Sequence, residues 1–317
     1  MAVTANTNET YNESIIREDL SAALTSISPT DAPVMSAIGT RNVENTYFEW
    51  SEIDLAAAAS NTKVEGDSAL PNDAPHNAIR KGNYTNISAK VVEVSDTNQN
   101  VNGVANAQTI ATQVAMALKA MKRDMELMVV SQQAANAGAS GTARVTAGIP
   151  AFLTTNTDRG VGGADPTTSG AGGAGYPNAA ATAGTSRTLT EALLKSTIAS
   201  CWDEGAEPSV VFCNSTNKQL MSTFTGNATR FKQAEDQKLN AAIDVYVSDF
   251  GELQLVPSRY VTTDVLVMDP NYAEIAYLQT ARQKPLARTG LSERRLISAE
   301  WGVQVTSEKA HGVIADV

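Results

Sequence analysis

One stretch without helix-breaking residues constrains the fold of this chain most strongly. Neither Pro nor Gly occurs from Val104 to Ala137, and Gly138 and Gly141 follow directly. Apolar residues recur within the stretch at steps of three and four, at Ile110, Val114, Ala117, Met121, Met125 and Met128. This period predicts a helix with one apolar face over residues 104–137. About 34 residues at 1.5 Å each give a rod of about 50 Å, comparable to the width of a compact protein of this size. We therefore expect a flattened molecule with this helix as its spine.

Two runs with strand-like alternation lie within residues 43–95. The first begins at Tyr47 and the second covers Tyr84 to Val94, and successive side chains alternate in character in both. We expect the two runs to pair as one long β-hairpin around a loop rich in Gly, Pro and Asp. A two-stranded ribbon of this length is marginal alone, so the hairpin needs a partner surface in the same chain or in another.

The first 42 residues do not resemble an independent domain. Met1 to Glu13 is rich in Asn and Thr, and Ser14 to Ser26 shows a short amphipathic pattern. Pro29, Pro33 and Gly39 interrupt the rest of this segment. We interpret residues 1–42 as an arm that contacts something else, and a frayed terminus packed on its own domain is the alternative.

The remaining segments differ in composition. Residues 156–187 are rich in Gly, Ala, Thr and Ser and predict a flexible surface insertion. Residues 188–280 predict a compact unit of helices and strands, with Thr190 and Asn214 as N-caps of two helices. Strands are expected there at residues 209–213, 243–248, 253–257, 265–268 and 274–278. Residues 281–317 alternate again over 294–306 and predict one or two further strands.

Several short motifs match those of cofactor-binding or catalytic sites, but the sequence around each motif lacks the other elements that such a site requires. Gly170 to Gly175 matches the G-x-G-x-x-G pattern of dinucleotide-binding loops, but it lies inside the Gly-rich segment, with Tyr176-Pro177 after it. Asp249 to Gly251 copies the metal-binding triplet of kinases without the other kinase motifs, and a hairpin turn explains it better. Two histidines and two cysteines have no zinc-ligand spacing. We expect no catalytic residue, no cofactor and no metal, and predict that the chain is not an enzyme.

The net charge of −10, from 34 acidic and 24 basic residues, argues against a protein that grips phosphates. The apolar runs are too short for a membrane span, and no secretory signal is expected. Charged residues make up only 18% of the chain, below the usual ~25%. A surface of small, weakly charged residues suits broad contact with other protein.

Two clusters of opposite charge are the candidate contact residues. The acidic cluster lies in the predicted hairpin and includes Glu49, Glu52, Asp54, Glu65 and Asp67. The basic cluster lies nearer the C-terminus and comprises Arg282, Lys284, Arg288, Arg294 and Arg295. The two clusters are either solvated faces or complementary surfaces between subunits, where charge sets register and orientation.

The order of these segments resembles the major capsid proteins of tailed bacteriophages, which share the Hong Kong 97-like fold. The motifs that carry the resemblance are residues 18–39, Phe48-Glu-Trp50, Lys122-Arg-Asp-Met-Glu126, residues 245–251, Val267-Met-Asp-Pro270, residues 286–290 and residues 300–305. Together they cover nearly the whole chain except the insertion at 156–187.

The resemblance implies an α+β fold with named parts. Residues 1–42 would be the N-terminal arm and 43–95 the extended loop. Residues 96–187 would form the peripheral domain with the spine helix 104–137, residues 188–280 the axial domain, and residues 281–317 the returning strands. Some relatives crosslink subunits through a Lys–Asn bond. Lys63 and Lys81 lie in the hairpin, but no matching Asn or catalytic Glu is found, so this chemistry is not expected.

The resemblance also implies a structural function. The chain would assemble with itself into pentamers and hexamers that close an icosahedral phage head around packaged double-stranded DNA, without sequence-specific binding. Assembly would occur in the host bacterial cytoplasm, and the product would be part of the virion. Separate scaffolding, portal and decoration proteins are possible partners. An encapsulin-like nanocompartment shell is the alternative within structural proteins, and a surface-layer protein or adhesin is the alternative from another class.

A contact hypothesis rests on the charges and on the unpartnered ribbon. The acidic hairpin of one subunit would lie over the region from Arg282 to Arg295, or over the spine helix, of an adjacent subunit. Reversing Arg294 and Arg295 to Glu is then expected to block assembly.

Overall fold

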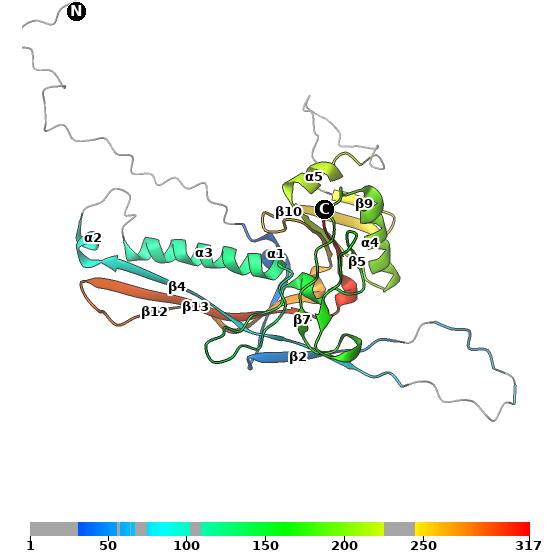
Figure 1. Cartoon of the computed structure of the whole chain (residues 1–317), viewed down its shortest axis with the longest axis horizontal. Helices are drawn as coiled ribbons and strands as arrows, with labels where there is room; N and C mark the ends of the chain where they lie inside the picture. The colour runs from blue at the N-terminus through cyan, green and yellow to red at the C-terminus, as the bar shows by residue number, and fades with distance from the viewer. Residues whose placement is uncertain (1–30, 56–57, 64, 67–74, 102–108, 225–244) are drawn as a thin grey trace, which may run out of the picture.

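The computed structural model describes residues 31–55, 58–63, 65–66, 75–101, 109–224 and 245–317. The molecule has an elongated half, in which one helix lies along a narrow sheet, and a compact half built on a second sheet (Figure 1). A hairpin projects from the region where the two halves meet (Figure 1). The chain contains both helices and strands, and runs of successive strands, such as β1 to β4 (residues 39–95) and β9 to β14 (residues 245–314), are separated by helices, which agrees with the predicted mixed fold.

The elongated half is a four-stranded sheet with the order β1-β12-β13-β4. Its strands are β1 (Gly39–Asn42), β12 (Ala273–Pro285), β13 (Ser292–Val305) and β4 (Asn86–Ser95). The strand β13 is antiparallel to both neighbours, and β1 runs parallel to β12. Short helices α1 (Pro33–Ala37) and α2 (Asp96–Asn100) precede β1 and follow β4. The strand predicted at 274–278 is thus the first part of a much longer strand.

The long helix predicted over residues 104–137 is present but is shorter than expected. Helix α3 covers Ile110–Val130, and the side chain of Thr109 caps its first turn. Its 21 residues give a length of about 31 Å. The prediction of a helix through residue 137 is wrong, because Gly148 packs on the last turn: a Cβ there would lie 2.0 Å from the Ser131 carbonyl oxygen. Residues 104–108 lie outside the described residues.

The prediction of one long hairpin over 43–95 is also wrong in its pairing. Strand β2 (Tyr47–Glu52) pairs with β3 (Ile79–Tyr84). The second predicted run forms β4 instead and pairs with β13 along its whole length. The alternation was correct, since side chains of β4 are alternately exposed and covered. The buried face of β4 packs into the core beside β13, and this burial selects a partner some two hundred residues away.

The compact half is a six-stranded sheet with the order β5-β14-β11-β8-β10-β9. Its strands are β5 (Thr157–Asp158), β14 (Gly312–Ile314), β11 (Val265–Met268), β8 (Val210–Cys213), β10 (Gly251–Pro257) and β9 (Val245–Ser248). Helices α4 (Glu191–Asp203) and α5 (Ser215–Met221) start at the predicted caps, because Thr190 and Asn214 accept backbone hydrogen bonds from Leu193 and Asn217. The predicted turn at Asp249–Gly251 is confirmed between β9 and β10.

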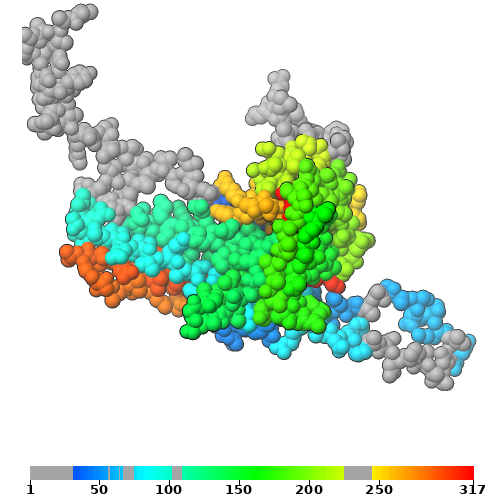
Figure 2. Space-filling view, viewed as in Figure 1, coloured from blue at the N-terminus to red at the C-terminus, as the bar shows by residue number. Residues whose placement is uncertain are grey.

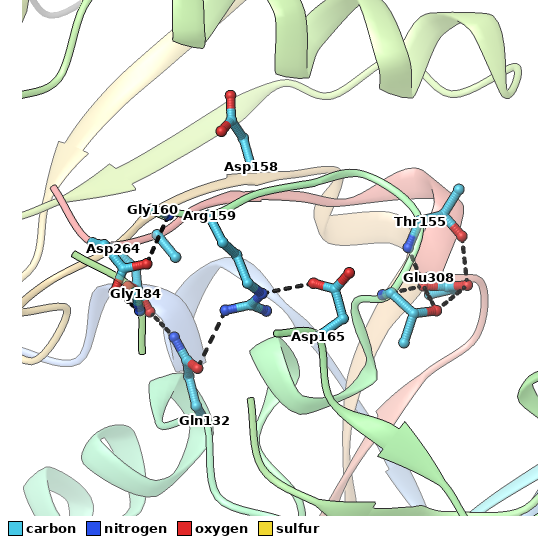
Figure 3. A network of polar contacts seen from close by, with 12 residues as sticks. Gln132, Thr155, Asp158, Arg159, Gly160, Asp165, Gly184, Asp264 and Glu308 are labelled. Carbon is cyan, nitrogen blue, oxygen red and sulfur yellow. Dashed lines mark hydrogen bonds and ion pairs between the residues drawn. The ribbon is translucent and has the colours of Figure 1, made fainter. Parts of the chain in front are cut away.

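The segment 156–187 is folded, so the prediction of a flexible insertion is wrong. Besides β5 it contains β6 (Thr167–Thr168) and β7 (Pro177–Ala179). The carboxylate of Asp316 accepts hydrogen bonds from the backbone of Gly160 and Gly184 at 2.9 and 3.0 Å. The guanidinium of Arg159 lies between Asp165 and Gln132 (Figure 3). The glycines allow this close backbone packing: a Cβ on Gly184 would lie 2.3 Å from the Gly160 oxygen.

Candidate inter-subunit surfaces

The base of the projecting hairpin is held by ion pairs within the chain. Glu49 pairs with Arg80 across the hairpin, and Glu52 pairs with Lys81. Beyond Leu55, the described residues 58–63 and 65–66 extend clear of the body (Figure 2). Of the remaining predicted acids, Glu65 is exposed and pairs with no residue that the structure describes. Asp67 lies outside the described residues.

A single lysine joins this base to the compact half. The Nζ of Lys309 lies 3.0 Å from carboxylate oxygens of both Asp54 and Glu204. Hydrogen bonds to these two carboxylates raise the pKa of Lys309 above its ordinary value. Asp54 is therefore matched inside the chain, as Glu49 and Glu52 are.

The G-x-G-x-x-G sequence clamps the edge of the hairpin. The backbone of Gly175 donates to the Arg80 oxygen at 2.8 Å and accepts from the Gly82 amide at 2.9 Å. The ring of Tyr176 packs against those of Tyr47 and Tyr84. The motif thus performs a structural task, and only a short 3₁₀ turn (Ala171–Gly173) lies within it.

Among the described residues, some members of the basic cluster form ion pairs with acidic residues of the same chain, and others do not. Arg294 pairs with Glu93 at 3.3 Å, and Arg295 and Arg288 also have acidic partners, namely Glu293 for both and Asp96 for Arg288. Arg282 and Lys284 are exposed and form no ion pair with any residue in the described part of the chain. Charge available for another subunit is therefore concentrated on β12.

These two cations lie beside an apolar strip on one face of the four-stranded sheet. In the register, Arg282 is opposite Ser298 and Lys284 is opposite Leu296 of β13. The next strand places Ala89 opposite Ser298 and Val91 opposite Leu296. Residues opposite one another share a face. We call this surface the open sheet face, and its members are Ile87, Ala89, Val91, Leu296, Arg282 and Lys284.

Helix α3 covers the other face of the same sheet, as the ion pair between Lys90 and Asp124 shows. Ile87 and Val91 on the open sheet face remain 59% and 52% exposed. A groove of about 430 Å³ lies at one end of this face, lined by Ile87, Arg144 and the turn at residues 137–143. The open sheet face therefore combines exposed apolar side chains, positively charged side chains and a groove at one end.

A buried carboxylate that the sequence reasoning did not single out connects the arm to α3. Glu126 accepts hydrogen bonds from the amides of Val34 and Met35, both at 2.9 Å. Burial raises the pKa of Glu126, and the two amides oppose that rise. Two of the family-like motif segments, residues 18–39 and 122–126, thus meet at this contact. Their spacing in the sequence carried no signal of it.

The described residues contain no cluster that could bind a metal ion, and their two cysteines are buried. Over the described ranges, no group of three or more His, Cys, Asp or Glu is arranged to hold a metal ion. Burial raises the pKa of Cys201 to about 12 and of Cys213 to about 11, so both remain thiols. None of the helices in this part of the chain is both long and apolar enough to cross a membrane.

Comparison with known proteins identifies the family of this chain. The family model described as SU10 major capsid protein matches residues 3–317. The chain is similar to the major capsid protein of Escherichia phage Phieco32, with 34% identity over 109 residues that cover 34% of this chain and 31% of that protein. The match thus spans about a third of that relative's length.

Two solved structures show the same fold at low identity. The capsid of the native GTA particle has a TM-score of 0.64 at 16% identity and covers 98% of this chain and 99% of that one. The holo encapsulin complex from Synechococcus elongatus has a TM-score of 0.55 at 11% identity and covers 98% and 96%. Since the family model extends over nearly the whole sequence, the protein belongs to the SU10 major capsid protein family.

Proposed function

We propose that this capsid protein forms pentamers and hexamers that close an icosahedral phage head around double-stranded DNA, with Hong Kong 97-like organisation. Residues 1–42 act as the arm, 43–95 include the extended loop, α3 is the spine of a peripheral domain over 96–187, and 188–280 form an axial domain. Residues 281–317 supply the final strands of the peripheral and axial domains. The function is structural, assembly takes place in the host cytoplasm, and scaffolding, portal and decoration proteins are separate partners.

The observation that carries this proposal is the open sheet face. It exposes Ile87 and Val91 together with Arg282 and Lys284, which have no acidic partner among the described residues. At the junction of the two halves, a hairpin projects with Glu65 unmatched within the described residues (Figure 1). The hairpin of one subunit and the open sheet face of the next would form a heterologous contact. Such contacts close into rings when the rotation that relates neighbouring subunits returns to the first subunit.

The structure changes which residues we assign to that contact. Glu49, Glu52 and Asp54 already have partners in their own chain. We therefore assign the hairpin tip, with Glu65 and Asp67, to the open sheet face of the neighbouring subunit, where Arg282 and Lys284 receive it. Arg288, Arg294 and Arg295 contribute to the shape of that face through their own ion pairs.

Charge reversal on the open sheet face tests the proposal. Arg282→Glu with Lys284→Glu should abolish shells in electron micrographs of the expressed protein. Adding Glu65→Lys and Asp67→Lys should restore a part of them. The matched control is Arg259→Glu, an exposed arginine on the compact half that pairs with Asp31, and it should assemble normally. Normal shells from the first double variant would contradict the assigned contact.

An encapsulin-like shell is the second candidate, because the encapsulin complex shares the fold over nearly the whole chain. Such a shell would enclose a protein cargo. Particles purified after nuclease treatment separate the two functions: protected double-stranded DNA supports the phage head, and a protein cargo without DNA supports the nanocompartment.

A further inference from the structure

The side of α3 that is turned away from the sheet carries three cations. Lys119 and Lys122 are exposed, and Arg123 is half-buried. At about 100° per residue, the three side chains fall within about 100° of the helix circumference, with Lys119 between the other two. Lys119 lies about 160° around the helix from Met121, which is 3% exposed and packs in the core. The three cations therefore share one face, opposite the packed face, and we call this face the basic stripe.

The acids of α3 do not neutralise the basic stripe. Its three cations form no ion pair with any residue that the structure describes. Asp124 lies toward β4, where Lys90 binds it. Glu126 is buried beneath α1, and its two oxygens accept hydrogen bonds from two amides of that helix. Lys122 attracts Glu126 through space, but no ion pair joins them. The basic stripe thus keeps its positive charge.

Exposed acids without an ion pair among the described residues are found on the compact half. They include Asp203, Glu207, Asp249 and Glu252. The helix α4 and the strand β9, beside which they lie, are remote from the middle of α3 (Figure 1). Charges further apart than about 8 Å are largely screened at physiological ionic strength. A polyanion can therefore contact the basic stripe although the chain as a whole carries a net charge of −10.

The two faces of the elongated half would meet different partners in a shell. The proposed function assigns the open sheet face to the hairpin of a neighbouring subunit. The basic stripe lies on the opposite surface of the same layer, because α3 covers the other face of the sheet (Figure 1). One surface of a closed shell faces its contents, and double-stranded DNA carries one negative charge for about every 1.7 Å of its axis. Among the components of such a shell, DNA has the chemistry that matches an unpaired basic stripe.

We propose that the basic stripe of α3 faces the interior of the shell and contacts phosphates of the packaged DNA. This inference rests on the proposed function and adds the surface of the subunit that meets the DNA. Lysine and arginine contact phosphates without reading the base sequence. Three cations bind DNA weakly, and the shell repeats the stripe in every subunit, so that many weak contacts act together.

Formaldehyde crosslinking of nuclease-treated particles that contain DNA tests this contact, because formaldehyde joins a lysine amine only to a base that lies against it. After digestion of the DNA, mass spectrometry should find nucleotide adducts on Lys119 and Lys122 at about tenfold or more the yield on Lys195 and Lys284. Lys195 is the matched control, since it is also an exposed lysine on a helix. Reductive methylation of empty shells corrects for the intrinsic reactivity of each lysine. Equal yields on these lysines, or the highest yield on Lys284, would overturn the proposal.

Neutralising one cation gives the second arm of the test. Lys119→Gln should lower the adduct yield on Lys122 several-fold, and Lys195→Gln should leave that yield unchanged. Both positions are exposed, so shell formation and DNA content should stay the same. An unchanged yield on Lys122 in Lys119→Gln would overturn the proposal. Particles that protect no DNA would contradict the proposed function as well, whereas DNA-filled particles without adducts on the basic stripe would contradict this contact alone.

Discussion

The base of the hairpin and the open sheet face both carry charged side chains, but their charges are balanced in different ways. At the hairpin base, Glu49, Glu52 and Asp54 each have a cation within the chain. On the open sheet face, Arg282 and Lys284 have no acid among the described residues. Balanced charge fixes the shape of one subunit, and unbalanced charge is available to another. The difference therefore separates residues that shape the hairpin from residues that receive a neighbour.

The largest effect is expected on the covered side of the sheet. Trp301 is fully buried and its indole N–H donates to Ser88 at 2.9 Å. Trp301→Ala should lower the free energy of unfolding by about 3–5 kcal/mol, measured by denaturant titration of the free subunit.

Substitutions on the open sheet face are the counterpart of Trp301→Ala on the covered face. Ile87→Ser with Val91→Ser should alter the free energy of unfolding by less than about 0.5 kcal/mol per site and still reduce shell yield. A loss of subunit stability as large as that of Trp301→Ala would show that the open sheet face belongs to the core of the subunit.

Acid lability should come from the body of the subunit. Burial lowers the pKa of His311 to about 4, and neither ring nitrogen has a side-chain hydrogen-bond partner among the described residues. The unfolded chain binds the proton more readily, so stability is lost as the pH falls from 6.5 toward 4. From pH 6.5 to 5 the loss should be about 2 kcal/mol, and His311→Leu should remove this part of the slope in denaturant titrations at each pH. An unchanged slope would contradict the assignment to His311.

Gly175→Ala tests the clamp on the hairpin. The residue has φ of +81°, and a Cβ would lie 2.2 Å from the Ser169 hydroxyl, so we expect a cost of about 1–3 kcal/mol and faster hydrogen exchange in β3. Gly172→Ala is the matched control, since its φ of +66° carries the same strain with nothing within 4 Å. Equal exchange in β3 for both variants would show that the clamp does not hold the hairpin.

A small stability effect is also expected at Lys309. Its side chain is 30% exposed, so Lys309→Met should change the free energy of unfolding by less than about 1 kcal/mol. Limited proteolysis of residues 53–78 should nevertheless become faster, because the hairpin base loses its tie to Glu204. Unchanged proteolysis would assign the tie to the Gly175 clamp alone.

Local rules predicted local features well. The caps at Thr190 and Asn214, the turn at Asp249–Gly251 and the alternation in β4 are all confirmed. These features depend on a few neighbouring residues, whose hydrogen bonds and side-chain directions follow from the sequence itself.

Long-range features could not be predicted in this way. The partner of β4 is a strand two hundred residues later, and α3 ends where Gly148 packs on Ser131. The Gly-rich segment resembled a flexible insertion in composition, yet Asp316 anchors its backbone. Alternation indicates a strand and composition indicates a loop. Neither shows which distant strand pairs with that strand, or which distant residue anchors that loop.

The candidate contact residues were predicted in part. Charge alone indicated both clusters, but the in-chain partners of Glu49, Glu52 and Arg294 depend on the fold. Only the structure separates these matched residues from Arg282 and Lys284.

Crosslinking of Glu65→Cys with Lys284→Cys in assembled particles tests the central claim most directly. If the hairpin tip of one subunit lies on the open sheet face of its neighbour, a short bismaleimide should give covalent ladders that end at pentamers and hexamers, and free subunits should give none. Intact shells without intersubunit crosslinks, or crosslinks confined to single chains, would contradict it.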